Sequence, residues 1–277
     1  MSMCRTWIIW FLLACSLTTT ASATTSALSP ELDNYIESTM KEFNIPGLAL
    51  AVINERGVMW SKGFGYRDVE NQLPIDGDTL FAIGSTTKAM TAAGIGILVD
   101  QGLLEFDKPL VNYLTDFQLF DPITTSLITP RDLLGHTSGL PRHDLLWYGA
   151  PWSREELYSR LRYLEPSAGF RQKFQYQNLM YMTAGVLIER VTGESWESFT
   201  RKEILQPLGM TRTTLNLTET QIDPNYSKAY SGGRGRPAVS IPMRDISAVG
   251  PAGSVHSSVE EMAQWLRLQL QKGEWEG

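Results

Sequence analysis

The chain has 277 residues, of which 43% are hydrophobic, 19% are charged and 10% are aromatic. This composition is ordinary for a folded globular protein and suits one large domain or two small ones. The formal net charge is −6, and the sequence has no arginine-rich run or basic stripe. We therefore do not expect nucleic acid as a partner.

The first 27 residues have the pattern of a signal peptide. Arg5 is the only charged side chain before Glu31, and the apolar run that follows it, TWIIWFLLACSL, is too short to cross a bilayer. Small residues near Ala23 and Ala27 offer cleavage positions. We expect a secreted or periplasmic protein with no stable membrane span after cleavage. The alternatives are an uncleaved anchor or a lipid on Cys15.

Cysteine and histidine usage argues against a metal site. Both cysteines, Cys4 and Cys15, lie in the predicted signal peptide, so the mature chain would have no thiol nucleophile, disulfide or thiolate ligand. The three histidines, His136, His143 and His256, do not match a zinc spacing such as H-E-x-x-H. The sequence therefore predicts neither a metal nor another cofactor.

The N-terminal third predicts a helix, a strand hairpin and a second helix. Residues 29–43 carry apolar side chains at helical spacing. Residues 48–53 and 58–66 read as two strands joined by a turn. Residues 80–102 predict a buried helix that ends at Gly102. Two strands do not make a stable sheet by themselves, so further strands must complete it.

From residue 107 to about residue 245 we expect helices and loops with few strands. The predicted helices of this region are residues 154–164, 179–192 and 195–204. The sequence SGGRGRP at residues 231–237 looks like a phosphate loop but lacks the Walker lysine, so we expect a flexible surface loop. A last amphipathic helix is predicted over residues 257–271.

A single lysine stands out in the second predicted helix. Lys88 is the only charged residue between Asp78 and Asp100, and Ser85 precedes it by three positions. A helix that began at Ser85 would place both side chains on one face. Burial and the helix N-terminus would lower the lysine pKa, and a neutral amine can activate a serine nucleophile. The alternative is that Ser85 caps the helix and Lys88 extends to solvent.

Two further patterns bear on this pair. A second S-x-x-K, from Ser38 to Lys41, lies in a charged amphipathic helix and is expected to be exposed and non-functional. The only Y-x-N of the chain, Tyr176-Gln177-Asn178, precedes an apolar helix. Near an ammonium, the Tyr176 phenol could relay protons, and Asn178 could bind a substrate carbonyl. Alternatively, Asn178 caps the helix and Tyr176 is a packing residue.

Together, Ser85-Thr86-Thr87-Lys88 and Tyr176-Gln177-Asn178 resemble the serine β-lactamase and penicillin-binding-protein superfamily. The branch that they resemble most contains class C β-lactamases, D-Ala-D-Ala carboxypeptidases, esterases and D-aminopeptidases. Residues 133–144, 203–213 and 251–266 are similar to stretches of the same family.

The resemblance implies an α/β fold with an antiparallel sheet flanked by helices, plus a large helical region. Residues 28–277 would form one β-lactamase-related domain. Within it, residues 28–106 would be the N-terminal α/β part and residues 107–245 the helical part. Residues 246–277 would begin the return to the α/β part.

The resemblance also implies a serine hydrolase that works through an acyl-enzyme and needs no cofactor. Ser85 would be the acylated nucleophile, and Lys88 would take or relay its proton. Tyr176 would be the partner base that later protonates the leaving group, and Asn178 would position the substrate. Which residue is the acylation base stays open. The substrate would be a small molecule or peptide: a β-lactam, a D-Ala-D-Ala peptide, a D-amino acid amide or an ester.

The third motif of the family, K-T-G or H-x-G, does not occur in the sequence. In the family it lies on a strand after the last predicted helix and helps to form the oxyanion hole, so we expect a C-terminally truncated chain without the remaining sheet strands. Removing one oxyanion donor can slow such enzymes about 10²–10³-fold. We expect this polypeptide, expressed alone, to be poorly soluble or inactive. The alternative is a non-catalytic family member.

Overall fold

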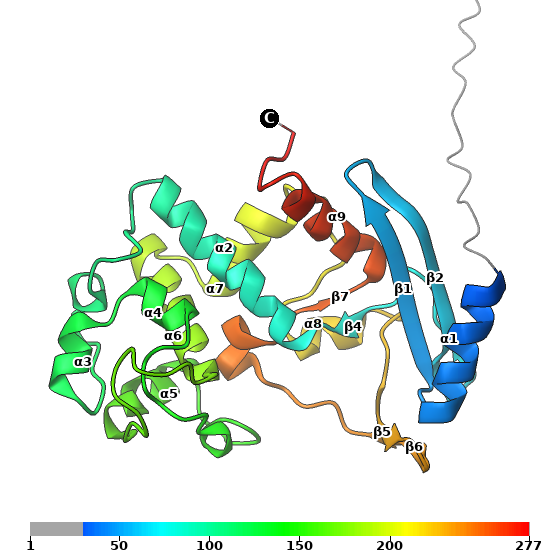
Figure 1. Ribbon diagram of the computed structural model, residues 1–277, viewed down its shortest axis with the longest axis horizontal. Helices are drawn as coiled ribbons and strands as arrows, with labels where there is room; N and C mark the ends of the chain where they lie inside the picture. The colour runs from blue at the N-terminus through cyan, green and yellow to red at the C-terminus, as the bar shows by residue number, and fades with distance from the viewer. Residues whose placement is uncertain (1–29, 277) are drawn as a thin grey trace, which may run out of the picture.

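The computed structural model describes residues 30–276. The predicted signal peptide and both cysteines lie outside these residues. Figure 1 shows a strand hairpin with α1 on one side, and a larger helical region on the other side of the molecule. No helix within residues 30–276 combines the length and the apolar character needed to cross a membrane.

The hairpin is formed by β1 (Gly47–Asn54) and β2 (Gly57–Asp68), which pair antiparallel. A short strand, β3 (Leu73–Pro74), follows on the outer side of β2, so the strand order is β1-β2-β3. The predicted hairpin is therefore confirmed. Among the described residues, β2 is the one strand that pairs with β1.

Helix α1 (Pro30–Phe43) covers one face of this hairpin (Figure 1). Its buried side chains, Ile36 and Met40, form a small apolar cluster with Trp60 and Phe64 of β2. The amphipathic spacing that predicted the helix thus matches its packing.

The predicted helix over residues 80–102 is shorter than expected. Strand β4 (Phe81–Ala82) and a 3-10 turn, η1 (Gly84–Thr86), come first, and α2 (Thr87–Asp100) follows them. Gly84 has a φ of 53°, a left-handed conformation that glycine adopts readily and an α-helix cannot contain. The helix therefore begins two residues after Ser85.

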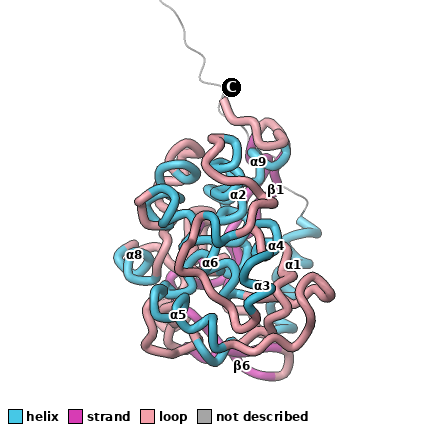
Figure 2. The backbone as a smooth tube through the Cα atoms, turned by 90° about the vertical axis from the view of Figure 1, so that its left-hand side faces the viewer, coloured by secondary structure: helices cyan, strands magenta, loops and turns pink. Residues whose placement is uncertain are grey.

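The main hydrophobic core lies in the helical region and centres on α6 (Asn178–Thr192). From Asn178 to Ile188 every residue of α6 is buried, because the other helices surround it. Figure 2 shows α6 in the middle of the molecule with α2 above it and α5 below it. The remaining helices of the region are α3 (Pro122–Leu127), α4 (Pro130–Leu134), α5 (Arg154–Arg160), α7 (Trp196–Thr200) and α8 (Leu217–Ile222).

The predicted helices of this region are confirmed with different ends. Residues 154–164 form α5 and a 3-10 turn, and residues 195–204 lie in α7 and the π-helical turn Arg201–Leu205 that continues it. Residues 231–237 lie at the surface as predicted, but most of them belong to strands and not to a flexible loop. Strands β5 (Ala229–Gly233) and β6 (Arg236–Ile241) form an antiparallel hairpin there, and Gly235, with a φ of 73°, allows the tight turn.

The last elements return to the hairpin. Strand β7 (His256–Ser257) pairs antiparallel with β4, and α9 (Val259–Leu270) then packs against β1 and β2. The final helix was predicted from residue 257, but Ser257 lies in β7. Ser258 caps the helix by accepting a hydrogen bond from the Glu261 N–H.

Candidate active site

Ser85 lies in the 3-10 turn between β4 and α2, and its side chain is exposed. The turn is held from both sides. Ile83 N–H donates to the Val255 carbonyl at 3.0 Å, and Val255 N–H donates to Thr87 Oγ1 at 3.3 Å. The pairing of β4 with β7 places Val255 next to this turn. The hydroxyl of Ser85 is therefore presented to solvent by a rigid turn.

Lys88 lies in the first turn of α2, and only 7% of its surface is exposed. Its Nζ donates to Ser85 Oγ at 3.1 Å, to Asn178 Oδ1 at 2.8 Å and to the Ala252 carbonyl at 2.7 Å. Burial lowers the pKa of Lys88, although the neighbouring Tyr176 opposes that shift. The amine is thus easier to deprotonate than an ordinary lysine and lies next to a hydroxyl.

Tyr176 approaches Ser85 from the segment before α6. Its hydroxyl donates to Ser85 Oγ at 2.5 Å, and its ring centroid lies 4.8 Å from Lys88 Nζ. Burial alone would raise the pKa of Tyr176, but interactions with Lys88, Ser85 and the positive charge of Arg142 outweigh it and lower the pKa. Lys88 and Tyr176 therefore both have lowered pKa values, and both contact the hydroxyl of Ser85.

Asn178 is the first residue of α6, and its amide is oriented at both ends. Its Oδ1 accepts from Lys88, and its Nδ2 donates to Asp144 Oδ1 at 3.3 Å. The cap of α6 is Gln177, whose side chain accepts from the Leu179 N–H. The alternative that Asn178 is the cap is therefore wrong, and its side chain lies in the cluster with Lys88.

His136 belongs to this cluster, although the sequence analysis considered it only as a metal ligand or as the histidine of an H-x-G motif and expected it to be neither. Its Nδ1 accepts from the Gln177 N–H at 3.0 Å, and its ring centroid lies 4.6 Å from that of Tyr176. Burial, with a smaller effect of Lys88, lowers the pKa of His136 to about 4. A neutral imidazole with an acceptor Nδ1 therefore fixes the backbone beside Tyr176. The available signal was its place in residues 133–144, which resemble a family stretch.

The Ala252 carbonyl is a second contact that sequence reasoning missed. It lies at the end of a 3-10 segment, η6 (Ser247–Ala252), which packs against α6 and α2. Arg154 of α5 holds the start of this segment, since its Nη2 donates to the Ser247 carbonyl at 3.0 Å. A backbone carbonyl carries no residue-specific signal, which is why the sequence did not reveal it.

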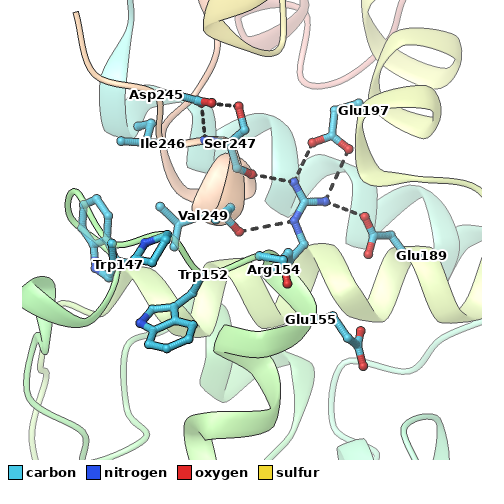
Figure 3. Close-up of a pocket in the computed structure, with 14 residues that line it drawn as sticks. Trp147, Trp152, Arg154, Glu155, Glu189, Glu197, Asp245, Ile246, Ser247 and Val249 are labelled. Carbon is cyan, nitrogen blue, oxygen red and sulfur yellow. Dashed lines mark hydrogen bonds and ion pairs between the residues drawn. The ribbon is translucent and has the colours of Figure 1, made fainter.

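Arg154 also lines one side of a pocket of about 610 Å³. In Figure 3 its guanidinium points toward the carboxylates of Glu189 and Glu197, and Trp147 and Trp152 lie on the other side. Only 14% of the Arg154 side chain is exposed, and burial would lower its pKa, but the two carboxylates raise the pKa overall. The network ties α5, α6 and α7 to η6, so its contacts support the segment that carries the Ala252 carbonyl.

The structure separates the two S-x-x-K sequences. Ser38 and Lys41 are exposed on α1, and Ser38 Oγ donates only to the Tyr35 carbonyl of its own helix. Their expected exposure is confirmed. By contrast, the structure brings all four predicted site residues together: Ser85, Lys88, Tyr176 and Asn178. In residues 30–276, no group of three or more histidine, cysteine, aspartate or glutamate side chains is placed to hold a metal ion.

Comparisons with known proteins identify the family and the fold of the chain. The family model described as Beta-lactamase matches residues 32–276. The chain belongs to the Beta-lactamase family. Unguisins hydrolase ungD′ of Aspergillus campestris is 32% identical over 256 residues, which are 88% of this chain and 48% of that protein. Protein flp of Staphylococcus aureus is 26% identical over 244 residues, with 87% of this chain and 48% of flp covered. The chain thus spans about half the length of the curated relatives it matches.

Solved structures show the same fold. The octameric penicillin-binding protein homologue from Pyrococcus abyssi superposes with a TM-score of 0.75 at 30% identity, covering 88% of this chain and 56% of that one. The class C β-lactamase from Rhodobacter sphaeroides gives a TM-score of 0.73 at 23% identity, covering 89% and 67%. The predicted superfamily and the α/β, β-lactamase-like fold are therefore confirmed.

Proposed function

We propose that this Beta-lactamase family chain is the acylating part of a secreted or periplasmic serine hydrolase. The observation that carries the proposal is that Ser85 Oγ accepts hydrogen bonds from both Lys88 Nζ and the Tyr176 hydroxyl. The names of the relatives support the class, since one is a hydrolase of unguisins. The substrate would be a small molecule or peptide with an amide, β-lactam or ester carbonyl.

In the first half of the reaction, Ser85 Oγ would attack the substrate carbonyl carbon. The hydroxyl proton would pass to the neutral amine of Lys88 or to the phenolate of Tyr176, which both contact that oxygen. The backbone N–H of Ser85 would donate to the developing oxyanion. The bond from the carbonyl carbon to the leaving nitrogen or oxygen would then break, and the leaving group would take the proton from Tyr176 or Lys88.

In the second half, water would attack the Ser85 ester and release the acid. The same pair would take a proton from the water and return one to Ser85 Oγ. Asn178 would donate its Nδ2 to the acyl carbonyl or to an amide of the substrate, because Lys88 fixes its Oδ1 on the opposite side. These roles use the chain's own residues and require no cofactor.

A substrate panel tests the proposal. The protein expressed from its complete gene would be assayed with a penicillin, a D-Ala-D-Ala peptide, a D-amino acid amide and a 4-nitrophenyl ester. At least one of these should be hydrolysed by the wild type and not by Ser85→Ala. Absence of both turnover and labelling by a fluorophosphonate would favour the alternative, a non-catalytic family member.

A further inference from the structure

A second positive charge lies beside the reactive hydroxyl. The guanidinium carbon of Arg142 lies 5.0 Å from the centroid of the Tyr176 ring, and the hydroxyl of that ring contacts Ser85. Unlike Lys88, Arg142 has a largely exposed side chain, with 59% of its surface accessible. It is therefore placed to meet a bound molecule rather than to support the core.

The position of Arg142 is fixed through Asp144. Its Nε donates to Asp144 Oδ2 at 2.6 Å, and the other oxygen of Asp144 accepts from Asn178. Arg142 is thus linked by two hydrogen bonds to the amide that contacts Lys88. Within residues 30–276, the two Nη nitrogens of Arg142 make no hydrogen bond. Those two nitrogens have the fork geometry that binds a carboxylate.

The charges around the reactive group favour an anion. The guanidinium of Arg142 stays positively charged beside Tyr176 whether or not the Lys88 amine is protonated. Asp144 is the one carboxylate that contacts Arg142 or Asn178 in the described part of the chain. Asp144 engages only the Nε of Arg142, so a second carboxylate can bind the Nη edge without displacing it. A neutral acyl chain would leave that edge in water.

From these contacts we infer that Arg142 selects substrates whose acyl part carries a carboxylate, which its Nη nitrogens bind while Ser85 attacks the carbonyl. This inference rests on the proposed function and names the substrate class of the same site. The carboxylate would lie on the side of Tyr176 and Asn178. Dicarboxylic half-esters and amides with an acidic acyl side chain are the chemical classes that fit.

A matched pair of esters tests the inference. The 4-nitrophenyl half-ester of glutaric acid and 4-nitrophenyl valerate have the same chain length and differ in one carboxylate. For each, kcat/KM would be measured over the Ser85→Ala background. The ratio of the anionic to the neutral ester should fall about tenfold in Arg142→Gln, because a charge-assisted bidentate pair is lost at a partly exposed position. Arg142→Lys should keep part of the ratio, since it retains the charge without the fork.

Arg131→Gln is the control for a general loss of charge. Arg131 is also paired with an aspartate, Asp107, and is 63% exposed, which is close to the exposure of Arg142. Its ratio should equal that of the wild type. An unchanged ratio in Arg142→Gln, or an equal fall in Arg131→Gln, would overturn the inference.

A binding measurement separates this inference from the proposed function. In Ser85→Ala protein, the affinity for monomethyl glutarate would be measured by calorimetry, with methyl valerate as the neutral partner. Adding Arg142→Gln should weaken the glutarate about tenfold and leave the valerate unaffected. If the wild type hydrolyses neither 4-nitrophenyl ester but Arg142→Gln still weakens the binding of monomethyl glutarate, the proposed function fails and the anion site stands. Equal affinities with and without Arg142 would refute the anion site whatever the turnover.

Discussion

Replacing Lys88 with methionine should slow acylation of Ser85 about 10³-fold and change stability little. The side chain keeps its length and apolar stem but loses the amine that contacts Ser85 Oγ at 3.1 Å. General acid–base groups contribute about 10²–10⁴-fold, and Lys88 is one of two candidates for that role. The substitution leaves Asn178 Oδ1 and the Ala252 carbonyl without this donor, at about 1–3 kcal/mol each.

The loss of buried charge offsets that destabilisation. Lys88 is 7% exposed, and keeping an ion at such a position costs several kcal/mol of desolvation. We therefore expect the free energy of unfolding to change by less than about 2 kcal/mol, because the two effects have opposite signs. A folded but slow variant would separate a catalytic role from a structural one.

The assay is the pH dependence of acylation by a fluorescent fluorophosphonate. Burial lowers the pKa of Lys88, so the fraction of neutral amine increases with pH around a midpoint that lies below the ordinary lysine value. The wild-type rate should rise along this limb and then level off, as a property of the coupled Lys88–Tyr176 pair. In Lys88→Met the limb that Lys88 contributes should be lost. Any limb that remains belongs to Tyr176 and should lie at higher pH, because the lysine that lowers the pKa of Tyr176 is gone. Lys41→Met, in the exposed S-x-x-K of α1, should behave as the wild type.

Acylation by Lys88→Met within tenfold of the wild-type rate, with the same pH limb, would refute the assignment of Lys88. A destabilisation well above 2 kcal/mol, measured by urea unfolding, would show instead that the amine is mainly structural. Tyr176→Phe would then be the remaining test of the proton pathway, since it removes the other contact to Ser85 Oγ.

Three further predictions concern the support of the site. The pKa of His136 is about 4 in the folded protein and about 6.5 in the unfolded chain. Between these pH values the unfolded chain binds more protons, so the free energy of unfolding should fall by on the order of 2–3 kcal/mol from pH 6.5 to pH 4. His136→Gln should show a smaller fall in urea unfolding, and an identical fall would contradict the role of His136. Arg154→Leu should destabilise the protein by about 3 kcal/mol, because two partly buried carboxylates lose their cation, whereas a change under about 1 kcal/mol would show that the network is not important. Gly185→Ala would place a Cβ 2.2 Å from Pro251 Cγ in η6. It should therefore destabilise the protein by about 1–3 kcal/mol and slow acylation of Ser85, because η6 must shift. Wild-type stability and a wild-type acylation rate would show that the packing of α6 on η6 does not support the site.

The sequence predicted the elements whose signals are local. Helix α1 and the β1–β2 hairpin have clear apolar periodicity, and Lys88 was noticeable because its neighbours are apolar. Strands β4 and β7 have two residues each, too few for any periodicity, and they exist only because distant segments pair. The β5–β6 hairpin is mostly exposed, so no alternation of buried side chains marked it.

The same distinction applies to the site. Ser85, Lys88, Tyr176 and Asn178 could be predicted, because side-chain types at fixed spacing carry their chemistry. His136 accepts a hydrogen bond from the backbone N–H of Gln177, and Lys88 donates one to the backbone carbonyl of Ala252. In both pairs the two residues lie far apart in the sequence. Such contacts depend on how the loops fold over α6, and no residue pattern reports them. Arg142 has no sequence pattern that marks it as a site residue, and only the structure shows that it lies beside Tyr176.

The most direct test of the central claim is to locate the covalent adduct. The protein from the complete gene would be treated with a fluorophosphonate, digested and analysed by mass spectrometry. The adduct should be on the peptide that contains Ser85, at Ser85 Oγ, and should be absent from Ser85→Ala and nearly absent from Lys88→Met. An unmodified Ser85, or an adduct on another serine such as Ser38, would contradict the account.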